Sequence, residues 1–163
     1  MEYLIDGLNV IKSSFIKKYG KKTIEFNKEF LIDILEKYKR KHPSIEITVV
    51  FDGGPSSFDI YREKRIKIVF SQDITADEKI REILEKKKSR SSISVVSDDR
   101  EVQEFTKILG SKSLKVSEFL DIVYPLDKKQ PINLTKDLEY KSKLKIEKEL
   151  KNFYEKKIKK IKK

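Results

Sequence analysis

The sequence predicts an α/β fold with a mainly parallel central sheet, followed by a basic helical tail. Short apolar runs rich in β-branched residues alternate with longer segments whose apolar residues recur every three or four positions. The last part of the chain is dominated by lysine. Strands that alternate with helices form a parallel sheet through right-handed crossovers, with helices on both faces.

Composition limits the chemistry that the chain can perform. Its 163 residues can bury one sizeable core, with an appendage rather than a second full domain. There is no cysteine and a single histidine, His42. The sequence therefore excludes a disulfide framework, cysteine-ligated zinc and a histidine-based triad. Acid–base or metal chemistry has to use carboxylates, amides, hydroxyls and water.

The formal net charge is +11. A basic chain of this size attracts polyanions, of which nucleic acid is the commonest; a lysine-rich composition that only maintains solubility is the alternative. No apolar run is long enough to span a bilayer. Met1-Glu2-Tyr3 leads directly into a strand pattern, without a basic and apolar leader. We therefore expect a cytoplasmic protein that does not associate with membranes.

The first predicted strand, residues 3–5, ends in the segment Asp6-Gly7-Leu8-Asn9. Residues 10–20 are predicted to form a short helix or turn. From residue 24 to residue 40, apolar side chains recur at helical spacing, which predicts an amphipathic helix. His42-Pro43 is expected to end it.

The second predicted strand, residues 45–51, is rich in β-branched residues, and a loop follows at Asp52-Gly53-Gly54-Pro55. The third covers residues 66–70. A helix is then predicted to begin after Thr75, because Thr75 and Glu78 have the spacing of a capping box.

The fourth predicted strand covers residues 93–97. Asp98 or Asp99 caps the next predicted helix, which Gly110 ends. A short strand at residues 114–116 follows, and Ser117 is predicted to cap a last short turn.

The predicted domain boundaries are residues 1–124 for the α/β domain, 125–134 for a linker and 135–163 for the tail. The tail has twelve lysines against five acidic residues, together with a helical stripe of apolar residues. Two interpretations stay open. The tail is either a solvated helix that packs its stripe on the domain, or a basic arm that binds phosphates, and one helix can do both with different faces.

Acidic residues follow three of the predicted strands and open one helix. Asp6, Asp52 and the pair Asp98-Asp99 follow strands, and Asp77 lies at a helix start. In parallel sheets, ligands bind outside the carboxyl ends of the strands. Crowded carboxylates disfavour one another's ionisation, which Mg²⁺ or Mn²⁺ with oxygen ligands would relieve. Such an ion polarises a phosphoryl group and lowers the pKa of bound water, so phosphodiester hydrolysis needs neither histidine nor cysteine.

Each acid also has a purely structural explanation. Asp77 can favour the helix dipole, Asp98 or Asp99 can be a helix cap, and Asp52 can form a turn. Taken singly, these three positions favour the structural explanation. Taken together with Asp6, three of the four acidic points lie at strand ends, which favours a site.

Four segments of the sequence, in this order, resemble the NYN domains, a branch of the PIN-like nucleases, and more narrowly their YacP-like group. They are Asp6-Gly7-Leu8-Asn9-Val10-Ile11, then Val49-Val50-Phe51-Asp52-Gly53, then Val69-Phe70-Ser71 with Thr75-Ala76-Asp77-Glu78, and finally Val95-Val96-Ser97-Asp98-Asp99-Arg100. The resemblance covers residues 3 to 120, and Leu8 departs from the family's usual tyrosine. It implies a three-layer PIN-like/NYN fold and endoribonuclease activity that depends on Mg²⁺ or Mn²⁺. Because the family is connected with RNA decay during translation, the ribosome is an implied partner.

The resemblance also implies residue roles. The implied catalytic residues are Asp6, Asn9, Asp77 and Asp98. The implied metal ligands are Asp6, Asp77, Asp98 and Asp99, with Asp52 and Ser97 in support. Asn9 would position a ligand or the scissile phosphate.

Basic residues provide candidates for RNA contacts. They are Arg62, Arg65, Arg100, Lys148, Lys151 and Lys156. A polar surface loop explains Arg62 and Arg65 equally well, and Arg100 could instead pair with a neighbouring acid.

The leading hypothesis is a metal-dependent endoribonuclease acting on single-stranded RNA or mRNA, in mRNA decay or RNA processing. Two alternatives stay open. One is a catalytically inactive RNA- or ribosome-binding module with the same fold, and the other is a phosphatase or DNA nuclease that uses the same carboxylates.

Overall fold

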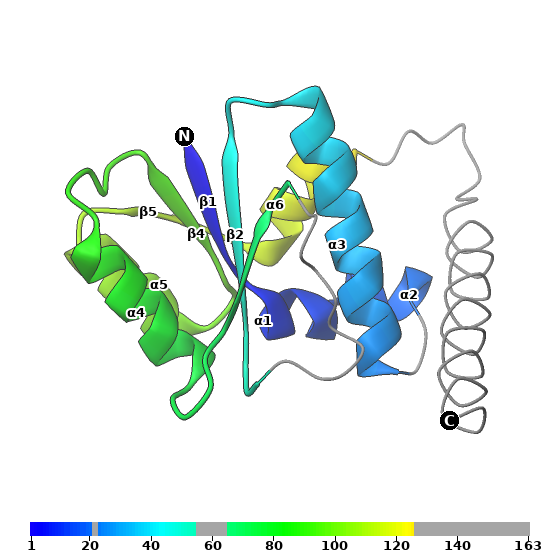
Figure 1. The fold of residues 1–163 in the computed structure, drawn as a ribbon, viewed down its shortest axis with the longest axis horizontal. Helices are drawn as coiled ribbons and strands as arrows, with labels where there is room; N and C mark the ends of the chain where they lie inside the picture. The colour runs from blue at the N-terminus through cyan, green and yellow to red at the C-terminus, as the bar shows by residue number, and fades with distance from the viewer. Residues whose placement is uncertain (21–22, 55–64, 126–163) are drawn as a thin grey trace, which may run out of the picture. The chain divides into compact units, whose positions relative to one another are not determined.

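A five-stranded sheet forms the centre of the computed structural model, which describes residues 1–20, 23–54 and 65–125 (Figure 1). The strand order is β3-β2-β1-β4-β5, and every neighbouring pair is parallel. The strands are β1 (Glu2–Asp6), β2 (Glu46–Phe51), β3 (Lys67–Phe70), β4 (Ile93–Val96) and β5 (Lys112–Leu114). The predicted α/β class is confirmed, and the sheet is entirely rather than mainly parallel.

Helices cover both faces of this sheet (Figure 1). The helices α4 and α5 pack on one face, and α1, α3 and α6 lie on the other. Their bounds are α1 (Gly7–Lys12), α2 (Ser14–Tyr19), α3 (Ile24–Lys41), α4 (Ala76–Lys86), α5 (Arg100–Ile108) and α6 (Val116–Val123). The segment predicted as a short helix or turn therefore forms two short helices, with Ser13 as the N-cap of the second.

The side-chain alternation of β1 decides which face receives the first acid. Leu4 is fully buried with Val50 and Val95 in the core beneath α4 and α5. Tyr3 faces the other way, with its ring 5.0 Å from that of Phe119 in α6. Because successive side chains of a strand alternate between faces, Asp6 lies on the same side as Leu4, which is the side of α4. Each buried aliphatic side chain of this core contributes about 1.5–3 kcal/mol.

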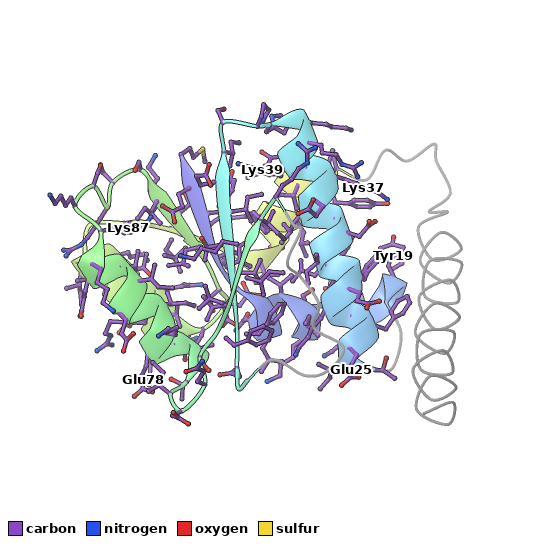
Figure 2. The ribbon with its side chains drawn as sticks, in the orientation of Figure 1. Tyr19, Glu25, Lys37, Lys39, Glu78 and Lys87 are labelled. Atoms are coloured by element: carbon purple, nitrogen blue, oxygen red, sulfur yellow. The ribbon has the colours of Figure 1, made fainter. Side chains whose placement is uncertain are left out.

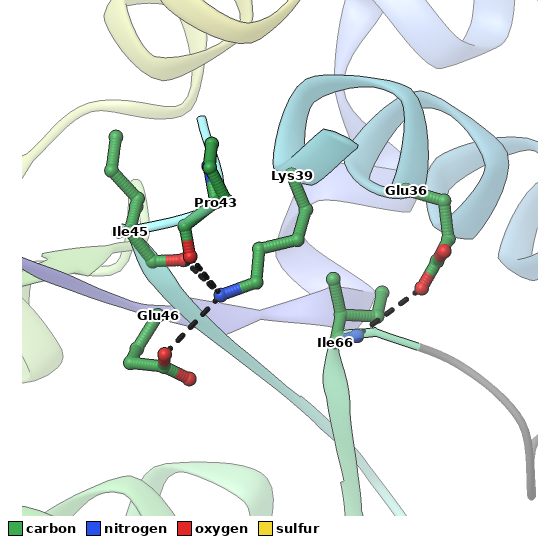
Figure 3. A network of polar contacts seen from close by, with 6 residues as sticks. All are labelled: Glu36, Lys39, Pro43, Ile45, Glu46 and Ile66. Carbon is green, nitrogen blue, oxygen red and sulfur yellow. Dashed lines mark hydrogen bonds and ion pairs between the residues drawn. The ribbon is translucent and has the colours of Figure 1, made fainter. Parts of the chain in front are cut away.

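The turn between α3 and β2 is held by one lysine (Figure 3). The Lys39 ammonium group donates hydrogen bonds to the carbonyl oxygens of Pro43 (3.0 Å) and Ile45 (2.7 Å), and it pairs with the Glu46 carboxylate at 3.2 Å. The predicted end of the helix at His42 is confirmed, since His42 is its C-cap. This turn lies at the amino end of β2, so it is structural and remote from the acids.

Two helix starts differ in how well the sequence predicts them. The capping box of α4 is confirmed, because Glu78 N–H donates to the Thr75 hydroxyl and Thr75 N–H donates to the Glu78 carboxylate; Figure 2 shows Glu78 at this end of α4. The cap predicted at Ser117 is wrong. The helix α6 begins at Val116, with Lys115 as its N-cap. The strand predicted at residues 114–116 lies two residues earlier, since β5 covers Lys112–Leu114.

The first compact unit of the chain spans Met1–Leu126. The predicted linker and basic tail lie outside the described residues. Among the residues that are described, no helix is long and apolar enough to cross a membrane.

Candidate active site

Four aspartates from separate elements line one cavity of about 180 Å³ at the carboxyl edge of the sheet. Asp6 ends β1, Asp52 follows β2, Asp77 lies in the first turn of α4, and Asp99 precedes α5. The parallel strands bring their carboxyl ends to one edge, which is why residues so distant in sequence meet there. The other lining residues are Leu8, Asn9 and Lys12.

Asp6 is the most enclosed of these acids, with 5% of its surface exposed. Its Oδ1 accepts a hydrogen bond from Asn9 N–H (3.0 Å) as the N-cap of α1, and its Oδ2 accepts one from the Ser97 hydroxyl (3.2 Å). Burial raises the pKa of Asp6, the two hydrogen bonds oppose the rise, and the charges of Asp52 and Asp99 add to it. The orientation of this carboxylate is therefore fixed from two elements.

The close approach of the start of α1 to the end of β2 depends on Gly7. A Cβ atom at this position would overlap the ring of Phe51, which is itself buried at the end of β2. Glycine lets α1 start directly above that ring. It thereby brings Asp6 and the residues of α1 to the same edge as Asp52.

Asp52 and Asp99 each use one oxygen to cap a helix. Asp52 Oδ1 accepts a hydrogen bond of 2.7 Å from the backbone N–H of Ala76, the first residue of α4. Asp99 Oδ1 accepts from the N–H groups of Glu101 and Val102. Asp52 is thus more than a turn former, since it joins the β2 loop to the helix that carries Asp77. The second oxygen of each carboxylate accepts no hydrogen bond from the described residues.

Asp77 stands apart because its carboxylate accepts no hydrogen bond from any described residue. The pKa of Asp77 is raised to about 6, first by burial and then by the charges of Asp6, Asp99, Asp52 and Glu101. A carboxylate in this position is surrounded by other negative charges and is not compensated by a donor. Binding of a cation or of a proton would neutralise the negative charge of this carboxylate.

Asp98 points away from the cavity. Its Oδ1 accepts a 3.0 Å hydrogen bond from Val116 N–H at the start of α6, and the residue lines a different cavity. Its backbone N–H donates to the Asn9 carboxamide oxygen at 3.0 Å. The structure therefore brings Asp6, Asp77 and Asp99 together and leaves the Asp98 carboxylate outside.

The bond to Asp98 also orients Asn9. Because the Asn9 carboxamide oxygen is occupied, the amide NH₂ is the group that remains for a ligand. Asn9 lines the cavity, so its NH₂ group suits an oxygen atom of a phosphate. The role expected for Asn9 in positioning the scissile phosphate stays a prediction.

Lys12 is a cavity residue that the sequence interpretation missed. It is the last residue of α1 and is exposed, and no described residue forms an ion pair with it. The signal was present in the sequence, because Leu8, Asn9 and Lys12 share one helix face at spacings of three and four residues. One cation beside four acids leaves the lining strongly negative.

The predicted RNA-contacting arginines separate into different regions. Arg100 is exposed and follows Asp99 directly as the first residue of α5, but it does not line the cavity. Arg65 lies just before β3, at the amino edge of the sheet, where its backbone N–H donates to the Glu36 carboxylate. The next residue, Ile66, donates its N–H to the same carboxylate (Figure 3). Arg65 is therefore remote from the acids. The remaining candidates, Arg62, Lys148, Lys151 and Lys156, lie outside the described residues.

The donor set of the cavity suits a hydrated magnesium or manganese ion. No three acidic side chains of the described residues lie close enough together to form a metal-binding group as they stand. Mg²⁺ retains several water ligands and is commonly bound through one or two carboxylates. A set of spaced carboxylates that includes one without a hydrogen-bond donor, Asp77, fits an ion held partly through water.

Comparison with known proteins gives the family. The model of the YacP-like NYN domain matches residues 3–163. A crystal structure of Rae1 (YacP) from Bacillus subtilis superposes with a TM-score of 0.63 at 22% identity, covering 96% of this chain and 93% of that one. The W164L mutant of the same protein gives a TM-score of 0.62 at 20% identity, with coverages of 85% and 90%. No curated protein matches the sequence significantly. The chain belongs to the YacP-like NYN domain family, whose members are generally nucleases.

Proposed function

We propose that this protein is a metal-dependent endoribonuclease that cleaves phosphodiester bonds of single-stranded RNA, in mRNA decay or RNA processing. The observation that carries the proposal is the cavity in which Asp77, with its pKa raised to about 6, faces the charges of Asp6, Asp52 and Asp99. Family membership and a net charge of +11 support it. The ribosome is a further proposed partner, supported by the family resemblance alone.

In this proposal, Asp6, Asp77 and Asp99 hold Mg²⁺ or Mn²⁺, directly or through water. The ion supplies polarisation of the phosphoryl group and a lowered pKa of bound water. Asp77 would be available to hold the ion, because neither of its oxygens accepts a hydrogen bond from a described residue. Asp6 and Asp99 contribute fixed positions, since hydrogen bonds within the protein already orient their carboxylates.

The other residues of the cavity bind and orient the RNA. The Asn9 NH₂ group donates to a non-bridging phosphate oxygen, in an orientation that the Asp98 N–H fixes. Lys12 provides the positive charge on the α1 side, and Arg100 provides it at the start of α5. Positioned donors of this kind act on charge that develops during the reaction. Asp52 anchors the start of α4 and so positions Asp77.

The direct test is cleavage of end-labelled single-stranded RNA by the full chain in Mn²⁺ and in EDTA. The parent is expected to give internal cleavage products in Mn²⁺ only. Asp6→Asn and Asp77→Asn should lose this activity, by about 100-fold or more if each positions the metal. Asp73→Asn is the matched control, because Asp73 is an exposed aspartate of the same loop region that does not line the cavity. Equal cleavage by the parent and both site variants would refute the proposed site.

A second candidate function is an RNA-binding module without turnover. The observation in its favour is that no three acidic side chains of the described residues form a metal-binding group. This candidate predicts retention of RNA on the protein in both Mn²⁺ and EDTA, with no new products. Running the same reactions on single-stranded DNA and on a phosphate monoester separates the remaining alternatives, a DNA nuclease and a phosphatase.

A further inference from the structure

A second cavity of about 150 Å³ is lined by the start of α2, by Asp98 and by α6. Its lining residues include three serines, one phenylalanine and two aspartates. They are Ser13, Ser14, Phe15, Asp98, Ser117 and Asp121. The activity proposed above uses none of these side chains. A cavity of about this volume holds a six-membered aromatic ring.

Two links connect residues that line this cavity with residues that line the acidic one. Lys12 lines the acidic cavity, and the next residue, Ser13, lines the second. Asn9 lines the acidic cavity and accepts the hydrogen bond from Asp98, which lines the second. A polynucleotide with a phosphate at Asn9 and Lys12 therefore has the second cavity next to it, within reach of a flanking nucleotide.

The two carboxylates decide which part of a nucleotide can enter. Ionised carboxylates only accept hydrogen bonds, so this wall repels a phosphate and attracts a group with N–H donors. Asp98 Oδ1 is occupied by Val116 N–H, whereas its Oδ2 and both oxygens of the exposed Asp121 accept nothing from the described residues. Guanine presents two adjacent donors on its Watson–Crick edge, N1–H and N2–H₂, and these match the two oxygens of one carboxylate.

Phe15 supplies a surface for stacking. Its ring is half-buried and packs against Tyr19 (centroids 5.0 Å apart) and against Tyr124 (5.6 Å). Tyr19 projects from α2 (Figure 2). These contacts hold the Phe15 ring in place while part of it faces the cavity. Stacking on an aromatic ring of this kind contributes about 1–3 kcal/mol per base.

We propose that this second cavity binds an unpaired guanine base adjacent to the phosphate that occupies the acidic cavity. Asp121 accepts N1–H and N2–H₂, Phe15 stacks on the ring, and the serine hydroxyls face the remaining edge. The inference rests on the proposed RNA substrate and makes it specific, since single-stranded RNA with a guanine at one flanking position becomes the preferred ligand. A basic peptide would also suit two carboxylates and an aromatic ring, but the links from Lys12 to Ser13 and from Asn9 to Asp98 favour the nucleotide.

The test measures binding and so needs no cleavage. Fluorescence anisotropy in EDTA compares three labelled oligouridylates that carry one central guanine, inosine or adenine. Guanine should bind about tenfold more tightly than adenine. Inosine should lie between them, because it keeps N1–H and lacks the 2-amino group. Equal affinity for the three oligonucleotides would overturn the proposal.

Two variants test whether the preference for guanine arises in the second cavity. Asp121→Asn should remove most of the guanine preference, while Glu104→Gln, an exposed acid of α5 that lines neither cavity, should keep it. Phe15→Leu should weaken binding of all three oligonucleotides by a similar factor. A guanine preference unchanged in Asp121→Asn would overturn the assignment. The assignment would also be overturned if a basic peptide bound in an Asp121-dependent way at concentrations at which the guanine oligonucleotide does not bind.

The outcome is separable from that of the proposed function. If the guanine preference is present in EDTA and no cleavage occurs in Mn²⁺, the base site stands and the nuclease proposal fails. If cleavage occurs at every position without regard to guanine, the nuclease proposal stands and the base site fails.

Discussion

The Ser97 hydroxyl donates a 3.2 Å hydrogen bond to Oδ2 of Asp6, ninety-one positions away in sequence. The same hydroxyl accepts a 3.1 Å bond from Asp99 N–H. In turn, the Gln103 side chain donates to the Ser97 carbonyl oxygen at 2.8 Å. One buried serine thus connects the acid that ends β1 with the acid that begins α5.

Ser97→Ala tests this connection. The variant removes a hydrogen bond that lowers the pKa of Asp6, so this pKa should rise further above its usual value. If ionised Asp6 is needed, the pH below which cleavage is lost should move upward in the pH–rate profile. Ser94→Ala, which alters a buried serine of β4 that lines neither cavity, should leave the profile unchanged. An equal shift in both variants would contradict a specific role for Ser97.

Asp77→Asn should stabilise the protein at neutral pH in the absence of divalent ions. The folded pKa of about 6 lies above the ordinary aspartate value of 3.8, so the folded chain binds the proton more tightly than the unfolded chain. Stability is therefore lost as pH rises between these two values. Asparagine carries no charge and avoids this loss. The gain should be about 1 kcal/mol at pH 7.5, because solvent screening and the lost helix-dipole contact reduce the full linkage value.

Thermal unfolding of the parent and of Asp77→Asn at pH 4 and pH 7.5 measures that gain. The difference in melting temperature should be largest at pH 7.5 and should shrink towards zero at pH 4. A variant that is less stable than the parent at pH 7.5 would show that burial and the neighbouring acids do not destabilise the ionised Asp77.

Added Mn²⁺ should raise the melting temperature of the parent. An ion that binds only the folded chain stabilises it by about 2.7 kcal/mol at 100 times its dissociation constant. The increase should be much smaller in Asp77→Asn, and Asp73→Asn should respond as the parent does. Differential scanning calorimetry gives this result without any substrate. Equal shifts in the parent and Asp77→Asn would place the ion elsewhere.

Lys12→Gln should weaken RNA binding in EDTA without changing the guanine preference. If Lys12 contacts one phosphate, the slope of log affinity against log salt should fall in magnitude by about 0.7 for a single strand. Lys86→Gln is the matched control, because Lys86 is an exposed lysine of α4 that lines neither cavity. A salt slope that Lys12→Gln leaves unchanged would exclude this contact.

Gly7→Ala should destabilise the fold by about 1–3 kcal/mol, since the added methyl group overlaps the Phe51 ring. Gly54→Ala provides the control, because a Cβ there meets no atom within 4 Å. Urea unfolding gives both values. The double variant Gly7→Ala with Phe51→Leu should lose less stability than the sum of the single changes; strict additivity would argue that the ring is not the obstacle.

The sequence alone was sufficient to predict the α/β class, four of the five strands and the edge at which the acids meet, while the fifth strand lies two residues earlier than predicted. Apolar periodicity distinguishes strands from helices, and the spacing of Thr75 and Glu78 marks the start of α4 by local sequence alone. The parallel arrangement follows from the alternation of the elements. For this reason Asp6 and Asp52 could be assigned to one edge of the sheet.

Only the tertiary structure decided which oxygens face the cavity. Asp98 and Asp99 are adjacent in sequence, and either could cap a helix. In the fold, α6 presents Val116 N–H to Asp98, while α5 leaves one oxygen of Asp99 beside Asp6. Such a choice depends on helices that pack from distant parts of the chain, and local sequence carries no record of it. Arg65 shows the same limit, because its distance from the acids follows from the direction of β3 in the sheet.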